Sequence, residues 1–501
     1  MKRESIKKDK WNVVWDKDVV DSRKTTALPV LHRPDRIAPV FAFDAPWESK
    51  ASSYHHIVKC HDGIYRLYYI SYPLQNPQTY YTHVCCLEST DCVNWTRPEY
   101  GLYEFEGSKR NNIVFQDLRE GAMGTDNFMV FLDPNPKCKP EERYKAVGLA
   151  ACINNDWSVC DLWCYVSPDG IHWKYSHTMF SKLEGMSWCF DSDNHIIWDG
   201  KRYVLYFRGR HRSRDYVQKA ENVKNESLRN IEQDIYNYRD IRVAYSDDFR
   251  KWEIYGELDY EDGEDYQVYA NHIMKYPRNE DVLIGFPVRN VERRSLEGTF
   301  SRLGGAVNVC KRNRSVAEAI RSAVVTTDAV FMVSKDGKRW RRSSDAFYTA
   351  GPESPYNWAY GDGYIVPYFF ETKGRFNGID NEYSFYFVEN SRSVKAKELT
   401  MYKIRLDGFY SYHADYYGAK LVTKKMTFKG EKMLLNFSTS ALGHIFVTIS
   451  DGEKTVKSLE VFGNSASREV DFEEDIKVFN GKKVTVTFEM KEADVYSFIF
   501  K

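Results

Sequence analysis

The stretch Ser167-Pro-Asp169-Gly-Ile-His-Trp173 is one of four related copies in this chain. All four share the pattern Ser-x-Asp-x-x-x-Trp, and their serines stand at positions 89, 167, 246 and 334, which are 78, 79 and 88 residues apart. Each copy follows a run of alternating apolar residues, so it marks the point where one strand ends, turns through Asp, and the next strand opens at Trp. A self-similar unit of this length indicates a repeat architecture.

The repeat predicts a β-propeller. About four strand-like runs fit into each unit of roughly 80 residues, as in a propeller blade, and the motif is the outer hairpin of that blade. In this hairpin we expect the Asp to cap its own turn and the Trp to pack between neighbouring blades. Four units extend to about residue 345. Residues 345–405 lack the motif but contain three more strand-like runs, which predict a fifth, atypical blade.

The C-terminal part of the chain has a different pattern. From Leu406 onward, short alternating strands are separated by turns at Asp-Gly-Glu and Asn-Gly-Lys, and this part has neither Cys nor Trp. The pattern is typical of a β-sandwich. The predicted fold is therefore all-β: a five-bladed propeller over residues 1–405, expected to be catalytic, and an accessory sandwich over 406–501. We expect the sandwich to brace the propeller rather than to bind sugar.

Composition excludes several classes of partner. The chain has 501 residues with 71 Lys and Arg against 71 Asp and Glu, so no net field attracts nucleic acid or an anionic membrane. No run of eighteen apolar residues occurs, and the N-terminus lacks the apolar segment of a secretory signal, so we expect a cytoplasmic protein. The ten cysteines show neither paired spacings nor adjacent His patterns, so we predict no zinc site and no disulfide framework.

Two polar segments, residues 209–240 and 292–323, interrupt the strand pattern. Segments of this length are lids, pocket walls or contacts of a homo-oligomer, and solvated insertions are the equally weighted alternative.

Polar residues cluster where the innermost strands of the blades are expected to start. These starts converge on the propeller axis although they are far apart in sequence. Polar side chains brought together there need mutual hydrogen bonds or a ligand. The simplest interpretation is a site for a polar ligand, with no cofactor and no metal assigned. The clusters are Asp44-Ala-Pro-Trp47-Glu48, Thr125-Asp126-Asn127, Phe190-Asp191-Ser192-Asp193, Glu264-Asp265-Tyr266 and Tyr269-Ala-Asn271-His272.

Several stretches give the chain a family resemblance. Residues 98–113, Phe131-Leu-Asp-Pro-Asn-Pro136, Gly285-Phe-Pro-Val-Arg289 and Arg405-Leu-Asp-Gly-Phe409 resemble a group of bacterial glycosidase-like propeller proteins. That group is similar in architecture to the five-bladed glycoside hydrolases of families 32, 43, 68 and 117. The resemblance runs from about residue 40 to the end and implies a glycosidase, but it leaves the substrate open; we expect a furanoside or a short oligosaccharide. The Asn-Asp-Pro-Asn, Arg-Asp-Pro and Glu-Cys signatures of family 32 are missing, so catalytic roles are not transferable from it.

Cleavage of a glycoside needs a proton donor and a second carboxylate that attacks or activates water. Asp126, Asp191 and Asp265 have comparable positions at three blade entrances and are the first catalytic candidates. Asp328 follows them, and Asp193 competes with Asp191 because both lie on one face of a strand. A turn or strand-end cap is the structural alternative for each. The alternative acids that the sequence leaves open are Glu48, Glu264, Glu353 and Glu382.

Other residues are candidates for substrate binding. Arginines that end apolar strands suit bidentate bonds to sugar or carboxylate oxygens, with surface salt bridges as the alternative. Aromatic residues beside the polar clusters suit stacking on a sugar ring, with packing between blades as the alternative. The candidates are Trp47, Glu48, Asp193, Arg208, Arg210, Tyr269, Asn271, His272, Arg289 and Trp358.

Three functions stay open on the sequence alone. A glycoside hydrolase acting on a small carbohydrate substrate is the first. A glycoside phosphorylase on the same scaffold needs one catalytic carboxylate and a basic phosphate pocket, which Arg208, Arg210 and Arg289 would supply. A non-catalytic carbohydrate-binding or scaffolding propeller predicts an axis blocked by apolar side chains.

Overall fold

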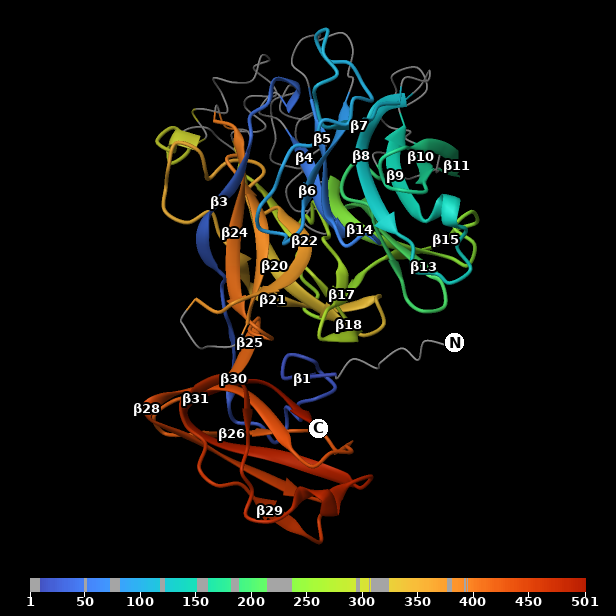
Figure 1. Ribbon diagram of the computed structural model, residues 1–501. Helices are drawn as coiled ribbons and strands as arrows, with labels where there is room; N and C mark the ends of the chain where they lie inside the picture. Colours follow the sequence, from blue (N-terminus) through green and yellow to red (C-terminus); the bar gives the residue numbers. More distant parts are fainter. Residues whose placement is uncertain are drawn as a thin grey trace.

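The computed structural model places the propeller above a smaller sheet domain (Figure 1). The structure describes residues 10–48, 52–72, 82–117, 122–150, 161–181, 189–213, 237–293, 298–305, 307, 324–375, 381–391, 393 and 395–501. The two segments predicted as insertions fall largely outside these ranges. No helix among the described residues has the length and apolar character needed to cross a bilayer. The seven described cysteines are free thiols.

Five sheets of the described chain are the blades of the propeller, so the predicted five-bladed fold is confirmed. The first contains β4 (Ser53–Lys59), β5 (Tyr65–Ser71), β6 (His83–Ser89) and β7 (Ile113–Phe115). The second contains β8 (Ala122–Leu132), β9 (Tyr144–Ala150), β10 (Leu162–Ser167) and β11 (Lys174–Phe180). The third contains β12 (His195–Trp198), β13 (Tyr203–Arg212), β14 (Asn237–Ser246) and β15 (Glu253–Glu257).

The fourth blade is built around β17 (Met274–Tyr276), β18 (Asn279–Gly285), β20 (Val325–Ser334) and β21 (Arg339–Tyr348). Two short strands extend it: β19 (Val288–Glu292) pairs with β20, and β16 (Asp259–Tyr260) pairs with β21. The fifth contains β22 (Ile365–Thr372), β23 (Glu382–Glu389) and β24 (Lys397–Arg405). Single-turn 3-10 helices lie at Pro46–Glu48 and Pro140–Glu142.

The fifth blade takes its outermost strand from the other end of the chain. β3 (Asp35–Phe43) pairs antiparallel with β24, with Phe41 opposite Leu399. The sequence predicted three strands for this blade from residues 345–405, and the structure completes it with β3. The ring of blades is therefore closed by hydrogen bonds between the first and last parts of the propeller.

The Ser-x-Asp-x-x-x-Trp motif has the structure expected of it. In the second blade, Ser167 Oγ donates to Asp169 Oδ1 at 2.9 Å, and the same oxygen accepts the N–H groups of Ile171 and His172, each at 2.9 Å. The tryptophan rings reach the preceding blade around the ring. The distances between ring centres are 6.3 Å for Trp173 and Tyr68, 6.2 Å for Trp252 and Phe180, 6.1 Å for Trp340 and Tyr206, and 6.4 Å for Trp95 and Tyr386.

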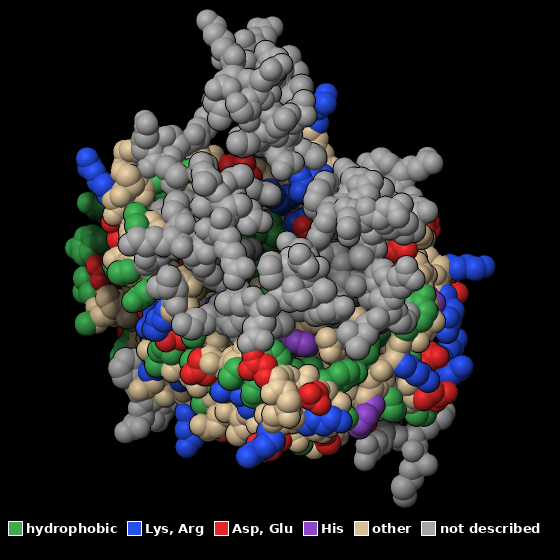
Figure 2. Space-filling view, turned by 90° about the horizontal axis from the view of Figure 1, so that it is seen from above, with side chains coloured by type: hydrophobic (Ala, Val, Ile, Leu, Met, Phe, Trp, Pro, Cys, Tyr) green, Lys and Arg blue, Asp and Glu red, His purple; other side chains and the backbone are tan. Residues whose placement is uncertain are grey.

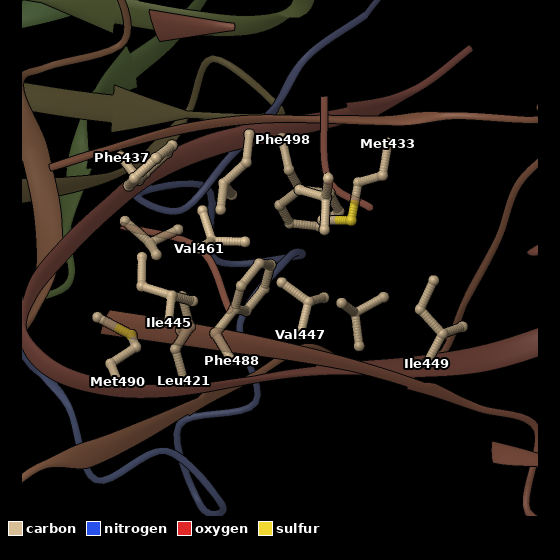
Figure 3. Packing of buried hydrophobic residues seen from close by; sticks show 14 of the residues in the cluster. Leu421, Met433, Phe437, Ile445, Val447, Ile449, Val461, Phe488, Met490 and Phe498 are labelled. Atoms are coloured by element: carbon tan, nitrogen blue, oxygen red, sulfur yellow. The ribbon is translucent and has the colours of Figure 1, made fainter. Parts of the chain in front are cut away.

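The C-terminal sheet is dominated by two long strands, β28 (Met433–Ser450) and β31 (Lys483–Phe500), which alternate buried and more exposed residues. Their buried faces enclose an apolar core in which Val447, Phe488 and Phe498 approach one another (Figure 3). This sheet has the arrangement of a β-sandwich, as predicted. Its other C-terminal strands are β25 (Tyr410–Ala414), β26 (Ala419–Val422), β27 (Met426–Thr427), β29 (Thr455–Lys457) and β30 (Asn464–Glu469), with a 3-10 turn at Ile476–Phe479.

The N-terminal residues also belong to this C-terminal sheet. β1 (Asn12–Val13) pairs with β31, and β2 (Leu28–Leu31) pairs with β25. The predicted boundary at residue 405 therefore holds for the C-terminal strands of this sheet. The sheet also contains β1 and β2, which the sequence prediction had assigned to the propeller.

A buried hydrogen-bond network joins the propeller to this sheet. Asp407, which has no exposed surface, accepts hydrogen bonds from Tyr276 of the fourth blade and from Ser497 of β31. Arg278 lies 2.9 Å from the same carboxylate, and Trp15 Nε1 donates to the Asp407 carbonyl oxygen at 3.0 Å. A buried charge with this set of partners fixes the two parts of the chain against each other.

Candidate functional site at the propeller axis

In four blades a residue in the left-handed backbone region lies within the innermost strand or a few residues before it. Tyr54, Asn127, Phe190 and His272 have φ angles of 55°, 58°, 66° and 44°. The register of β4 shifts between Ser53 and His56, and that of β8 shifts around Asn127, as at a β-bulge. Such bulges re-aim the neighbouring side chains, and non-glycine residues in this region are found where function requires the conformation.

Asp126 and Asp191 are brought together at this entrance. Asp126 is half-buried, and its Oδ1 accepts hydrogen bonds from Tyr72 Oη at 2.7 Å and from the Asn127 N–H at 2.9 Å. Burial raises the pKa of Asp126 to about 6, and the nearby negative charge of Asp191 raises it further against the effect of the Tyr72 hydrogen bond. A carboxyl with a pKa of about 6 holds or releases a proton near neutral pH.

Asp191 has a different partner. The guanidinium group of Arg208, whose side chain is 1% exposed, donates to Asp191 Oδ2. The contact places a buried positive charge directly against the Asp191 carboxylate. The Arg208 guanidinium also lies 5.3 Å from the centre of the Tyr269 ring, and Arg239 lies at the same distance from that ring. The predicted binding residues Arg208 and Tyr269 therefore lie beside the carboxylates.

A second charged pair lies next to the first. His272 Nε2 is 3.0 Å from Asp193 Oδ2, and both side chains are almost fully buried. The other ring nitrogen, Nδ1, is 3.0 Å from the Phe286 carbonyl oxygen, which only accepts. Nδ1 therefore donates to this oxygen, while Nε2 faces the Asp193 carboxyl group. Although burial alone would raise it, the positive charge of His272 lowers the pKa of Asp193 below its usual value.

His56 is a structural link at the axis. Its Nδ1 donates to the Tyr54 carbonyl oxygen at 3.0 Å, and its Nε2 accepts the Val130 N–H at 2.7 Å. This pattern fixes one neutral tautomer and joins the innermost strands of the first two blades. Burial lowers the pKa of His56 to about 4 and that of His195 to about 3, so both are uncharged at neutral pH.

A cavity opens beside these groups. Its volume, counted with the open space at its mouth, is about 570 Å³. Seen from above, acidic and basic side chains lie together in a hollow near the middle of this face of the propeller (Figure 2). The cavity is lined by Ser53, Tyr54, His55, Asp193, Tyr269, His272, Tyr360, Gly361, Tyr364, Ile365, Val388, Ser391 and Lys397.

Asp265 is held by a histidine of the third blade. Its Oδ1 is 2.8 Å from Nε2 of His211, whose Nδ1 is 3.2 Å from Asp240 and 3.5 Å from Glu257. The hydrogen bond to Asp240 is the main cause that raises the pKa of His211 to about 9, followed, against the effect of burial, by the hydrogen bond to Asp265. We therefore interpret Asp265 as part of a charge network at the end of the third blade.

The same network contains the metal-ligand group found among the described residues. Ligand atoms of His211, Asp240 and Glu257 lie within 4.8 Å of one another. Arg242 Nε donates to Asp240 at 3.0 Å, and the protonated imidazole of His211 carries a positive charge. Both cations oppose the binding of a metal ion, so the group fits an ion-pair network better than a metal site.

Asp328 is held by Arg289. Arg289 Nε and Nη2 donate to the two Asp328 oxygens at 2.7 and 2.6 Å, and the residues are opposite each other on β19 and β20. The bidentate bond expected of Arg289 thus goes to a neighbouring carboxylate. Asp328 and Arg289 are outside the cavity lining.

Glu48 and Trp47 are part of the packing of the first blade. Glu48 is fully buried, receives hydrogen bonds from Arg97 at 2.8 and 3.1 Å, and also bonds Tyr69. Trp47 Nε1 donates to Asn112 at 2.7 Å. These contacts give both residues a structural explanation.

The remaining candidates have mixed positions. Asn271 is buried and donates to the Asp193 carbonyl oxygen at 2.8 Å, which links two blades. Trp358 Nε1 donates to the Gly351 carbonyl oxygen at 2.9 Å. Arg210 is half-buried on β13, and its carbonyl oxygen accepts from Arg242. Of the alternative acids, Glu382 is paired with Arg375, while Glu264 and Glu353 are exposed.

Sequence reasoning missed several residues of the cavity. Tyr360 and Tyr364 come from the start of the fifth blade, and Lys397 comes from the first position of β24. The available signal was the segment Tyr360-Gly-Asp-Gly-Tyr364, which leads into the innermost strand as the polar clusters do in other blades. This blade lacks the repeat motif, so the sequence prediction did not include the segment.

Comparison with known proteins gives matches among solved structures. No family model and no curated protein matches the chain. An N-acetylgalactosamine deacetylase from F. plautii is 12% identical over 74% of this chain and 94% of its own, with a TM-score of 0.43. A structure described under the GH130 family of mannoside phosphorylases, which contains glycoside hydrolases, is 12% identical over 76% and 97%, with a TM-score of 0.42.

The GH93 α-L-arabinofuranosidase of Fusarium graminearum is 11% identical over 75% of this chain and 99% of its own, with a TM-score of 0.39. The last two matches are named for glycoside-active enzymes, the class that the sequence resembles. Identities of 11–12% and TM-scores below 0.5 are too low to carry an activity or a site residue over to this chain.

Proposed function

We propose that this protein hydrolyses a glycosidic bond, with Asp126 as the general acid and Asp191 as the second carboxylate. The observation that carries the proposal is the contrast between these two neighbouring aspartates. Burial raises the pKa of Asp126 to about 6, while Asp191 receives a hydrogen bond from buried Arg208. One carboxyl is suited to donate a proton and the other to act as an anion, which is the division of roles that glycoside cleavage requires.

The surroundings of the pair support this assignment. Asp126 and Asp191 are not among the lining residues of the cavity, but Tyr54 and Tyr269 line it and are close enough to Asp191 for its charge to act on their pKa. We therefore expect a bound sugar to extend from the cavity toward the carboxylates. Aromatic rings and hydroxyl groups are the usual lining of sugar sites. A scaffolding propeller would have apolar side chains along its axis, whereas most of the described residues that line the cavity are polar or charged.

The phosphorylase alternative needs basic groups for inorganic phosphate. Two of the three arginines considered for that role, Arg208 and Arg289, bond Asp191 and Asp328. We therefore favour water over phosphate as the acceptor. Turnover that depends on added inorganic phosphate would contradict this choice.

A panel of aryl furanosides and pyranosides tests the proposal, with wild type beside Asp126→Asn and Asp191→Asn. We expect Asp191→Asn to lose at least about a thousandfold in kcat/KM on the aryl glycoside that wild type cleaves, and Asp126→Asn to lose as much on a glycoside whose leaving group needs protonation. Asp328→Asn is the matched control and should keep its activity. Activity that survives both axis substitutions would overturn the assignment.

The pH profile gives a second, independent test. A general acid works only in its protonated form, so kcat/KM should fall as the pH rises through about 6, the pKa of Asp126. In Asp126→Asn, with an aryl leaving group that needs no protonation, this alkaline limb should disappear. An unchanged limb would assign it to another group.

A further inference from the structure

A buried carboxyl lies behind one side of the cavity. Asp362 is 3% exposed and stands in the middle of the segment Tyr360-Gly-Asp-Gly-Tyr364, which leads into β22. Tyr360 and Tyr364 line the cavity, and we call this pair the tyrosine wall. Their ring centres lie 5.5 and 5.9 Å from that of Tyr269, another residue of the lining. The tyrosine wall thus belongs to the proposed site, although the proposed hydrolysis gives Asp362 no role.

The segment lies between the fourth and fifth blades. Asp362 is flanked by Gly361 and Gly363, whose φ angles are 108° and 83°. A Cβ at Gly361 would lie 2.7 Å from Ser391 Cβ, and a Cβ at Gly363 would lie 3.0 Å from the backbone of β20. Thr327 of β20 donates through Oγ1 to the Asp362 carbonyl oxygen at 2.7 Å and accepts the Gly361 N–H at 3.1 Å. The main chain of the segment is therefore held from both sides.

The Asp362 side chain holds the start of the same bend. Its Oδ2 accepts the Ala359 N–H at 3.1 Å. The preceding residue, Trp358, has a φ angle of 57°, in the left-handed region. A non-glycine residue keeps this conformation only where its surroundings fix it. The carboxyl thus ties residues 358–359 to the middle of the segment, and Tyr360 lies inside the closed bend.

The environment of Asp362 disfavours its charged form. Burial raises the pKa of Asp362 to about 7. Hydrogen bonds from the Ala359 and Trp358 N–H groups oppose this rise, and the charge of Glu389 adds to it. No ion pair within the described part of the chain contains Asp362, so no cation offsets the cost of ionising it there.

Charged groups on the surrounding strands have partners of their own. On β23, Glu389 is paired with half-exposed Arg36 of β3 at 2.8 Å. On β20, Asp328 is paired with Arg289 at 2.6 Å. On β21, the neighbour is Tyr348, whose pKa burial raises well above the usual value, so its phenol keeps the proton. These strands therefore supply the buried carboxyl with neutral or negative neighbours.

The protonation of Asp362 is coupled to the position of the segment. A carboxyl in water has a pKa of about 4, against about 7 for Asp362 in the closed segment. The stability that Asp362 contributes to the closed segment is therefore full below about pH 4 and is lost as the pH rises through 7. Once ionised, the carboxylate gains from contact with water, which an open segment provides.

We propose that Asp362 is a positioning residue of the cavity: as a neutral acid it keeps Tyr360 and Tyr364 in the cavity wall, and on ionisation it releases them. The proton that it loses passes to water, and no other bond changes. The inference rests on the proposed function, because the tyrosine wall belongs to the same site. Its test needs neither turnover nor a ligand.

Hydrogen exchange of the full-length protein at pH 5 and pH 8, followed by mass spectrometry, tests the proposal in residues 358–364. Asp362→Asn keeps an oxygen acceptor but cannot ionise. The ratio of the exchange rate in wild type to that in Asp362→Asn, taken at the same pH, is free of the intrinsic effect of pH on exchange. We expect this ratio to rise by at least about tenfold between pH 5 and pH 8. A ratio that stays constant would overturn the proposal.

Two further variants separate the carboxyl from its surroundings. Asp345→Asn is the matched control, because Asp345 is an exposed carboxylate on β21, and residues 358–364 should exchange in it as in wild type. Asp362→Ala lacks the acceptor for the Ala359 N–H, so its segment should exchange faster than that of Asp362→Asn by the same factor at both pH values. Equal protection in Asp362→Ala and Asp362→Asn would refute the positioning role.

If Asp362→Asn does not fold, wild type alone decides. Residues 167–173 are the internal reference. Although burial opposes it, hydrogen bonds from the His172 and Ile171 N–H groups lower the pKa of Asp169, which stays ionised at both pH values. Exchange in residues 358–364 relative to this reference should rise by at least about tenfold from pH 5 to pH 8. If the two segments keep the same relative rates, the proposal is wrong.

The outcomes for this inference and for the hydrolase are separate. A rising exchange ratio together with no turnover of any glycoside would refute the hydrolase and leave the inference standing. Turnover that depends on Asp126 and Asp191, together with a constant exchange ratio, would do the reverse.

Discussion

Aspartates at the two ends of the blades have opposite environments. At the outer hairpins, the turn aspartates accept N–H groups of their own turn, and those of Lys251 and Arg250 lower the pKa of Asp248. At the axis, burial raises the pKa of Asp126 to about 6, and Asp191 faces a buried arginine. The same side chain is a structural cap at one end and a strained, half-buried acid at the other.

The difference shows how repetition and function divide a propeller. The turn aspartates recur in four blades because each blade needs the same hairpin. The axis residues differ from blade to blade, with Ser53, Asp126, Asp191 and Asn271 at or beside the bends of the inner strands. The repeated aspartates stabilise the hairpin of each blade. The axis residues are not repeated, as is expected of a site for an asymmetric ligand.

The largest expected effect comes from removing a carboxylate from a buried arginine. Asp191→Ala should lower the free energy of unfolding by about 3–5 kcal/mol, because Arg208 is 1% exposed and keeps its charge. Asp328→Ala should cost about 1 kcal/mol or less, since Arg289 is 23% exposed and reaches water. Denaturant unfolding of both variants checks this. Similar losses would mean that burial of the arginine does not set the cost.

The second largest effect is a gain in the free energy of unfolding. A folded-state pKa raised to about 6 means that the stability contributed by Asp126 is present below about pH 4 and lost as the pH rises through 6. Asp126→Asn should therefore be more stable than wild type by about 1–2 kcal/mol at pH 8 and equal to it at pH 4. Thermal unfolding at the two pH values measures the difference. A loss of stability at pH 8 would contradict a raised pKa.

Replacement of a turn aspartate should affect stability alone. Asp169→Ala removes the acceptor of the Ile171 and His172 N–H groups and should cost about 1 kcal/mol with no change in activity or ligand binding. Asp247→Ala is a control, because Asp247 is exposed beside the equivalent turn of the third blade. Loss of activity in Asp169→Ala, with the fold intact, would break the comparison.

The smallest effect concerns the network around His211. With a pKa raised to about 9, the stability that His211 contributes is full below about pH 6.5 and lost as the pH rises through 9. The advantage in Tm of wild type over His211→Gln should therefore shrink by about 2 °C between pH 6 and pH 10. His444→Gln, on an exposed strand of the other domain, is the control. A constant difference would contradict the charged state of His211.

Most of the fold was predictable because each copy of the motif contains the residues that define its own hairpin. Ser167, Asp169 and Trp173 fix a hairpin through contacts within seven residues, and four copies give the architecture. The pairing of β3 with β24, and of β1 and β2 with the C-terminal sheet, was not predictable. These strands lie outside the repeats, and their partners lie at the far end of the chain.

The site was predictable only in part. The convergence of inner strands places Asp126 and Asp191 together, because it follows from the fold alone. Asp265 looked equivalent to them in sequence and Asp328 came next, but His211 and Arg289 bind these two carboxylates, and those partners come from other strands. Lys397 could not have been found, since it lies on the third strand of its blade and reaches the cavity through its length.

The closure by β3 sets an order for folding during synthesis. A ribosome delivers Asp35–Phe43 early, but its partner β24 only after nearly the whole propeller has been made. Until then the strand is an open edge that another chain can pair with, and the ring cannot close. Chains released before Arg405 should therefore aggregate rather than fold to shorter propellers. A circular permutant that joins β3 directly behind β24 should shorten the time between the synthesis of these two strands.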